Sequence, residues 1–157
     1  MSKNGDMIAR LYGLPECETP EGVRIVRAIA ADRHEVLKFV TAHFDAGWAG
    51  EAEQALLQPV SKCFIAVENG RILGFACYDA AALGFFGPIG VEAGCRGRGI
   101  GRALLLRTLH AMREYGYAYA VIGWVGSAAP FYRDVIGAEF IHGGEPKNSV
   151  YSNLINL

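Results

Sequence analysis

Arginines and glycines alternate in one short stretch of the chain, Cys95-Arg96-Gly97-Arg98-Gly99-Ile100-Gly101-Arg102. Glycine lets backbone N–H groups approach a ligand with no Cβ in the way. A helix that begins in such a loop also offers unpaired N–H donors and a partial positive charge. The arginines add local positive charge, although the net charge of the whole chain is −1. The stretch therefore predicts a binding site for a pyrophosphate or a similar anion.

Two better-known glycine-rich loops fit this stretch poorly. A P-loop requires G-x-x-x-x-G-K-[ST], and the sequence contains no such run. A dinucleotide-binding loop requires G-x-G-x-x-G near the first strand of a βαβ unit, and here Arg102 stands where the third glycine would be. A nicotinamide-dependent enzyme is therefore disfavoured.

The elements on either side of the loop can be predicted from the spacing of apolar residues. Residues 83–91 form an apolar run with glycines and Pro88, which is typical of a strand at an edge, a bulge or a splay. Residues 99–115 place their apolar side chains on one half of a helix, and Gly116 ends it. Residues 117–125 form a continuous apolar run, as in a buried central strand. The anion-binding loop is thus expected between a strand and a long helix.

The rest of the chain indicates a single mixed α/β domain. Asn69-Gly70 predicts a hairpin between two strands, and Asp32 is expected to cap a helix. Residues 1–21 are treated as an N-terminal extension, of which 8–11 could be ordered, and residues 22–157 as the domain. The remaining strands are predicted at 23–27, 63–68, 71–78, 138–141 and 150–155, and the remaining helices after Asp32, at 49–57 and at 130–135.

The glycine–arginine stretch and a later segment resemble those of a known family. Arg96-x-x-Gly99-x-Gly101 matches the [QR]-x-x-G-x-[GA] signature of the GNAT acetyltransferase superfamily, and it follows Gly90-Val91 and opens a helix. About thirty residues later, Ala128-x-x-Phe131-Tyr132 and a Gly-Ala-Glu-Phe stretch at 137–140 resemble the family's second CoA-contacting segment. The resemblance extends from about residue 23 to residue 157. It implies a GNAT-like single domain: a central twisted mixed sheet of about six to seven strands, flanked by about four helices, with splayed parallel central strands.

The resemblance also implies an activity and a set of site residues. Proteins of this family move an acetyl group from acetyl-CoA to a primary amine by direct attack, through a tetrahedral intermediate, and no metal is expected. By resemblance, Tyr132 protonates the departing thiolate, and the Val91 N–H stabilises the oxyanion. The implied acetyl-CoA-binding residues are Ile89, Gly90, Val91, Arg96, Gly97, Arg98, Gly99, Ile100, Gly101, Arg102, Ser127, Phe131 and Tyr132.

The sequence departs from the family pattern in two places. Many relatives carry an Asn seven residues before the Tyr, where this chain has Val125, with Ser127 as a substitute. Some relatives keep a catalytic Glu in the strand at 83–91, where this chain has no carboxylate. The general base is therefore left open, with Glu92, Asp79, His110 and His142 as candidates. These departures keep a non-catalytic acyl-CoA-binding or regulatory module as the alternative function.

The resemblance places the acceptor over the first two helices and the last strand pair. In this chain, Phe44, Asp45, Trp48 and Glu51 could form an aromatic and acidic pocket for a cationic amine. The alternative is a core aromatic pair with solvated acids. A small-molecule amine, a peptide N-terminus and a protein lysine all remain open as acceptors.

Composition limits the remaining possibilities. The chain has 157 residues, 52% of them hydrophobic, and a pI near 6.4, which indicates a globular domain and no general nucleic-acid binder. Its four cysteines are widely spaced and show no metal-ligand pattern. With no signal pattern and no apolar run of about 18 residues, we expect a soluble, cytoplasmic protein without membrane contact. A homodimer is compatible with the apolar content and with the resemblance.

Overall fold

A seven-stranded mixed sheet organises residues 4–155, which are the residues that the computed structural model describes. The strands are β1 (Met7–Arg10), β2 (Arg24–Arg27), β3 (Cys63–Glu68), β4 (Arg71–Tyr78), β5 (Phe85–Val91), β6 (Tyr119–Ile122) and β7 (Glu139–Phe140), and their order in the sheet is β2-β3-β4-β5-β6-β1-β7. The helices are α1 (Arg33–His43), α2 (Ala46–Leu56), α3 (Ile100–Tyr115) and α4 (Ala129–Ile136). This arrangement confirms the predicted mixed sheet with flanking helices.

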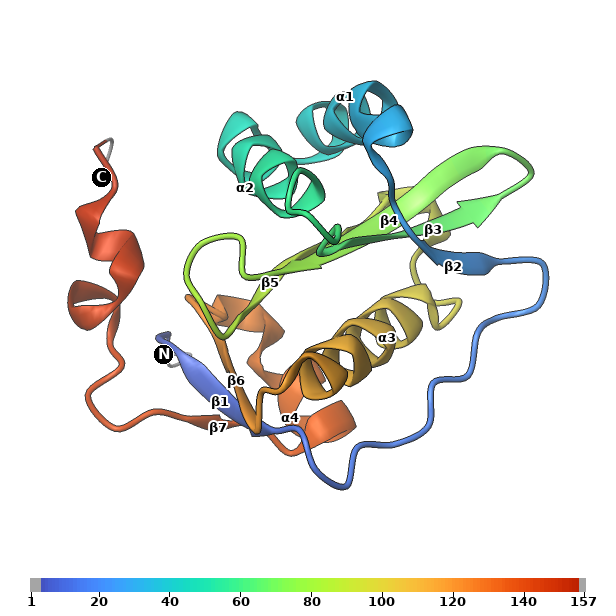
Figure 1. The fold of residues 1–157 in the computed structure, drawn as a ribbon. Helices are drawn as coiled ribbons and strands as arrows, with labels where there is room; N and C mark the ends of the chain where they lie inside the picture. Colours follow the sequence, from blue (N-terminus) through green and yellow to red (C-terminus); the bar gives the residue numbers. More distant parts are fainter. Residues whose placement is uncertain (1–3, 156–157) are drawn as a thin grey trace.

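The helices cover both faces of the sheet. α1 and α2 lie on one face, and α3 and α4 lie on the other (Figure 1). Successive residues of a strand point to opposite faces, and the two cores reflect this. Phe64 and Ala76 belong to the core under α3, whereas Ile65, Phe75 and Cys77 belong to the core under α1 and α2.

The two central parallel strands separate after a short contact. β5 and β6 pair only through Phe85 with Val121 and Phe86 with Ile122. β5 then shows an irregularity in its pairing with β4 around Gly87 and Pro88. Beyond β6, the backbone turns to the N-terminal segment instead of β5, because the Trp124 N–H donates to the Asp6 carboxylate at 3.1 Å. The predicted splay of the central strands is therefore confirmed.

The N-terminal residues form part of the sheet. β1 pairs antiparallel with β6 on one side and with β7 on the other, so residues 7–10 of the predicted extension are an interior strand. Residues 11–22 then cross the outer side of α3 (Figure 1), where the His110 ring lies 2.8 Å from the Pro15 carbonyl and the Cys17 thiol contacts the Ala103 carbonyl at 3.4 Å. α3 is consequently buried on two sides.

Several predicted elements differ from the structure. The strand expected at 150–155 is wrong, because Val150–Asn153 forms a 3-10 helix and β1 already pairs with both β6 and β7. The central strand expected at 117–125 covers only Tyr119–Ile122, since the residues after it diverge from β5. Asp32 is the N-cap residue of α1, but its side chain does not cap this helix. Its carboxylate accepts a hydrogen bond from the Ile29 N–H instead. α2 begins three residues earlier than predicted, because Asp45 caps it by accepting from the Trp48 N–H at 2.8 Å.

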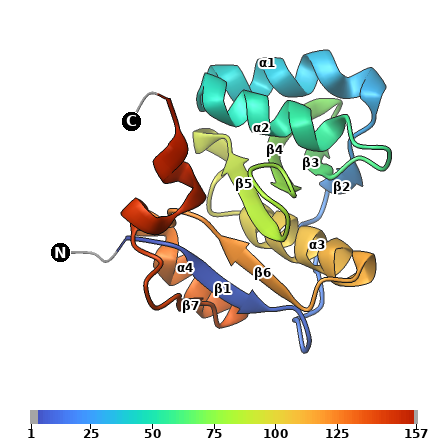
Figure 2. The same ribbon diagram turned by 60° about the vertical axis from the view of Figure 1, so that its left-hand side comes forward.

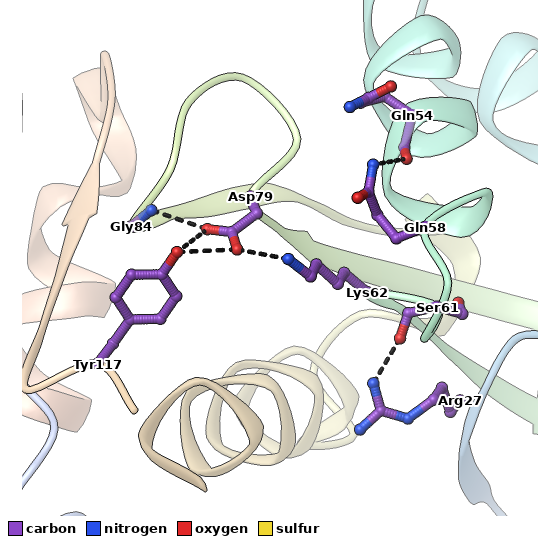
Figure 3. A network of polar contacts seen from close by, with 8 residues as sticks. All are labelled: Arg27, Gln54, Gln58, Ser61, Lys62, Asp79, Gly84 and Tyr117. Atoms are coloured by element: carbon purple, nitrogen blue, oxygen red, sulfur yellow. Dashed lines mark hydrogen bonds and ion pairs between the residues drawn. The ribbon is translucent and has the colours of Figure 1, made fainter. Parts of the chain in front are cut away.

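A buried ion pair fixes the turn between β4 and β5 (Figure 3). The Asp79 carboxylate accepts from Lys62 Nζ at 2.8 Å, from the Tyr117 hydroxyl at 2.9 Å and from the Gly84 N–H at 2.7 Å. The side chains of Lys62 and Asp79 are only 8% and 2% exposed. Burial by itself lowers the pKa of Lys62, but the hydrogen bond and charge of Asp79 and the nearby Tyr115 outweigh it and raise the pKa. Lys62 therefore stays charged inside the protein.

Candidate active site

A cavity of about 1090 Å³ lies where β5 and β6 separate. Its walls come from β5, the loop before α3, the start of α3, the segment after β6, α4, the start of α2 and the C-terminal segment. Ligand-binding pockets commonly enclose 300–1,000 Å³, so this cavity has room for an extended ligand.

Most of the predicted acetyl-CoA-binding residues line this cavity. They are Ile89, Gly90, Val91, Arg96, Gly97, Gly99, Ile100, Gly101, Arg102, Phe131 and Tyr132. Two predicted residues do not line it. The Arg98 guanidinium forms an ion pair with Glu68, with contacts of 2.6 and 3.2 Å, and Ser127 is exposed in the turn before α4.

The loop before α3 has the backbone geometry of an anion site. Gly97 and Gly99 both have φ of +83°, a region in which side chains are strained. The first backbone bond of α3 runs from the Ala103 N–H to the Gly99 carbonyl. The N–H groups of residues 100–102 therefore have no partner within the helix, and Arg96 and Arg102 line the same end of the cavity. This end of the cavity can therefore bind an anion such as a pyrophosphate.

The wall next to the loop offers further polar groups for a ligand. In residues 4–155, no strand pairs with the β6 side of β5 beyond Phe86, so its backbone faces the cavity. The indole nitrogen of Trp124, which also lines the cavity, is buried without a hydrogen-bond partner among these residues. Buried indole N–H groups normally donate a hydrogen bond. An amide carbonyl of a bound ligand would supply the missing acceptor.

Tyr132 is one of the residues that line the cavity. It belongs to α4, is 5% exposed, and its ring lies 6.2 Å from that of Phe86. Burial raises the pKa of the Tyr132 hydroxyl well above its usual value. The hydroxyl is therefore protonated at neutral pH and can donate a proton. Val125, which stands where many relatives carry Asn, is buried and also lines the cavity.

The opposite wall of the cavity is aromatic and acidic. Phe44, Asp45, Trp48 and Glu51 all line it. The ring of Phe44 lies 5.2 Å from that of Trp48 and 5.7 Å from that of Phe75. The tip of this ring also lies directly against the strand, because a Cβ on Gly90 would come within 2.3 Å of its Cζ. The glycine at position 90 is thus required for this ring to close the wall.

The C-terminal segment contributes a part of the site that the sequence did not indicate. It runs from β7 toward α2 (Figure 2), and its residues Tyr151 and Leu154 line the cavity. The Tyr151 ring lies 5.4 Å from that of Trp124, and a Cβ on Gly123 would come within 2.4 Å of it. Tyr151 is therefore packed closely against the segment after β6.

The four candidate bases named from the sequence lie outside the cavity wall. Asp79 is held by Lys62 and Tyr117, Glu92 is paired with Arg71, and the His110 ring contacts the Pro15 carbonyl. His142 is exposed in the turn after β7. Each of the first three therefore has a structural partner.

Between residues 4 and 155, no group of three or more His, Cys, Asp and Glu side chains is placed to hold a metal ion. Within the same residues, no helix combines the length and the apolar character needed to cross a membrane.

Residues 26–137, more than half of the chain, match the acetyltransferase (GNAT) family. The chain belongs to the GNAT acetyltransferase family. This GNAT chain is 32% identical over 123 residues to a mycothiol acetyltransferase from Nocardia farcinica. The match covers 66% of this chain but only 40% of that protein.

Solved GNAT structures share the fold. A GCN5-related N-acetyltransferase from Sphaerobacter thermophilus gives a TM-score of 0.66 at 23% identity, over 88% of this chain and 48% of that one. A ribosomal-protein-alanine N-acetyltransferase from Brucella melitensis gives 0.58 at 18% identity, over 76% of this chain and 95% of that one. The chain thus spans about half or less of the length of the Nocardia and Sphaerobacter proteins and most of the length of the Brucella protein.

Proposed function

We propose that this GNAT transfers the acetyl group of acetyl-CoA to a primary amine. The observation that carries the proposal is a single cavity at the β5–β6 splay, which brings together the glycine–arginine loop, the Tyr132 hydroxyl and an aromatic and acidic wall. The first suits a pyrophosphate, the second suits a leaving thiolate, and the third suits a cationic amine.

Each step of the transfer has residues to serve it. The N–H groups from Arg98 to Arg102, with the side chains of Arg96 and Arg102, hold the pyrophosphate. The backbone of Ile89, Gly90 and Val91 binds the pantetheine amides. The Val91 N–H donates to the thioester oxygen and stabilises the oxyanion as the amine attacks.

Tyr132 completes the transfer by giving its proton to the departing CoA thiolate. A free thiol has a pKa of about 8.5, and the pKa of Tyr132 is raised by burial. A tyrosine that stays protonated at neutral pH can donate at the moment the sulfur leaves. Phe131, the neighbouring residue on α4, also lines the cavity, and its ring lies 5.2 Å from that of Tyr132.

The relatives agree with an amine or thiol-containing acceptor but do not select one. The names of two of them describe acetylation of mycothiol and of an alanine of a ribosomal protein. A small-molecule amine and a peptide or protein amine are therefore both included in the test. The acidic groups Asp45 and Glu51 favour an acceptor that binds as a cation.

Thermal unfolding with ligands tests the first half of the proposal. Acetyl-CoA at 100 times its Kd should stabilise the protein by about 2.7 kcal/mol, which is about 5–11 °C for a chain of this size. NAD and ATP serve as controls. If acetyl-CoA, NAD and ATP stabilise the protein equally, or if none of them stabilises it, the assignment of acetyl-CoA as the ligand is wrong.

Release of CoA thiol over a panel of amines and peptides tests the second half. Acetyl-CoA binding together with amine-dependent thiol release is the expected result. Val125 and the lack of a carboxylate in β5 favour a second function, that of a non-catalytic acyl-CoA-binding module. Stabilisation by acetyl-CoA without thiol release for any amine would support that second function.

A further inference from the structure

Glu51 differs from every other carboxylate near the cavity. Its helix α2 presents Trp48 and Glu51, one turn apart, to the cavity. The other carboxylate in the wall is Asp45, which is exposed and whose oxygen already accepts from the Trp48 N–H at 2.8 Å. Glu51 is half-buried and carries no such helix-capping bond.

The arginines and tyrosines in the cavity wall cannot accept a proton from a substrate at neutral pH. Arg96 and Arg102 are permanently charged. Tyr132 and Tyr151 have pKa values raised chiefly by burial, so both are already protonated. The Cys95 thiol lies 3.7 Å from the Arg71 guanidinium and 3.8 Å from the Glu92 carboxylate, away from the acidic wall.

We infer that Glu51 is the base that takes a proton from the acceptor ammonium, and that the Tyr151 hydroxyl positions it. The assignment rests on the proposed acetyl transfer. Glu51 on α2 and Tyr151 on the C-terminal segment both line the cavity, and each of the two side chains shifts the pKa of the other. Tyr151 is itself held in place by Trp124 and by its close approach to Gly123.

The protons balance in this scheme. The acceptor nitrogen enters as an ammonium and loses two protons on its way to the amide. Glu51 takes the first before attack and passes it to solvent. The second proton leaves the nitrogen as the C–N bond forms and the C–S bond breaks. Tyr132 gives its own proton to the departing thiolate, and the second proton from the nitrogen then reprotonates Tyr132. The products are the amide, CoA thiol and one proton.

The surroundings of Glu51 make it a stronger base than an exposed carboxylate. Burial raises its pKa, the negative charge of Asp45 on the same helix raises it further, and the hydrogen bond from Tyr151 opposes the shift. Buried Cys77 on β4 is close enough for the charge of Glu51 to contribute to its raised pKa, and the charges of Asp6 and Tyr132 contribute to the raised pKa of Tyr151. A carboxylate with a raised pKa accepts a proton more readily than an exposed one.

Glu51→Gln is the central test, with Glu53→Gln as the matched control on the same helix. The probes are phenethylamine and a short peptide with a free N-terminus. Glu51→Gln should lower kcat by roughly 10²-fold or more, while stabilisation by acetyl-CoA stays as in the wild type. The Glu53 side chain pairs with Arg33 at 2.9 Å and does not line the cavity, so Glu53→Gln should keep kcat within about twofold.

The pH profile distinguishes a base from a structural residue. In the wild type, kcat should fall on the acid side as Glu51 becomes protonated, and Glu51→Gln should lack this fall. Tyr151→Phe removes the hydrogen bond that lowers the pKa of Glu51, so the acid-side fall should move to higher pH. Independently of activity, a raised pKa means that wild-type stability falls as pH rises above about 4.3, the ordinary Glu value, and Glu51→Gln should not show this fall.

The outcomes separate the two proposals. A wild type that binds acetyl-CoA but releases no thiol with either probe overturns the proposed transfer and this assignment with it. An active wild type with an equally active Glu51→Gln variant overturns the assignment alone. A slower Glu51→Gln variant with an unchanged pH profile shows a structural role and also overturns it.

Discussion

Replacing Asp79 by Asn should destabilise the protein by about 3–5 kcal/mol, the usual cost of removing one partner of a buried ion pair. The Lys62 and Asp79 side chains are 8% and 2% exposed and lie 2.8 Å apart, so water cannot replace the lost carboxylate. Asn tolerates the φ of 54° found at position 79. The substitution therefore removes the charge without straining the turn.

The cost has an upper limit, because Lys62 can lose its proton. Deprotonating a lysine of ordinary pKa about 10.4 at pH 7 costs about 4.6 kcal/mol. The expected loss of about 3 to 4.6 kcal/mol corresponds to a fall in Tm of about 6–18 °C. The same limit gives a pH signature. The loss in Asp79→Asn should shrink as pH rises from 7 to 9, whereas the wild type, in which the pKa of Lys62 is raised, keeps its ion pair over this range.

Thermal unfolding followed by circular dichroism at both pH values measures the effect. Lys62→Met combined with Asp79→Asn should recover most of the loss, because no unpaired ammonium remains. Glu53→Gln is the control, since the Arg33–Glu53 pair is 49% and 39% exposed at a similar distance of 2.9 Å, and it should change stability by less than about 1 kcal/mol. A loss below about 1 kcal/mol in Asp79→Asn, or a double variant less stable than the single one, would refute the reasoning.

Three other substitutions probe the cavity. Tyr132→Phe should lower kcat by roughly 10²-fold or more and leave acetyl-CoA binding intact; an unchanged kcat in the thiol-release assay would remove its acid role. Gly90→Ala should lower the free energy of unfolding by about 1–3 kcal/mol through overpacking, because its Cβ would meet the Phe44 ring at 2.3 Å. Calorimetry should show that adding Phe44→Leu relieves part of this cost. If the stability losses of the two substitutions simply add, the contact is contradicted. Arg102→Ala should raise the Kd for acetyl-CoA by about 10- to 100-fold, and Arg98→Ala, whose side chain pairs with Glu68, should change it much less; equal effects in a binding titration would contradict this distinction.

Local chemistry explains which parts of the fold could be predicted. The hairpin strands at 63–68 and 71–78 have the bounds expected from the sequence, because Asn69 and Gly70 adopt the positive φ values that their turn needs. The glycine–arginine loop and the helix after it depend on contiguous residues in the same way. The family and the fold, inferred from this loop and its context, are confirmed.

The features that could not be predicted depend on contacts between residues that are far apart in the sequence. Arg98 is paired with a residue thirty positions away, which its own neighbours do not reveal. A short segment such as Met7–Arg10 carries too weak a pattern to be assigned to a sheet whose other strands are distant in the chain. The final segment has the composition of a strand, but it forms a 3-10 helix whose Tyr151 lines the cavity. The role of Glu51 depends on that same tertiary contact.

The position of β1 also affects when the sheet can be completed. Met7 pairs with Ile122, a separation of 122 − 7 = 115 residues, and contacts this distant in sequence form slowly. On a ribosome that adds about 5–20 residues per second, β1 waits about 6–23 s before β6 has been made. Its outer neighbour β7 comes later still. β1 is thus among the last of the described strands to find its place, and the edge of β6 that faces away from β5 stays unpaired until it does.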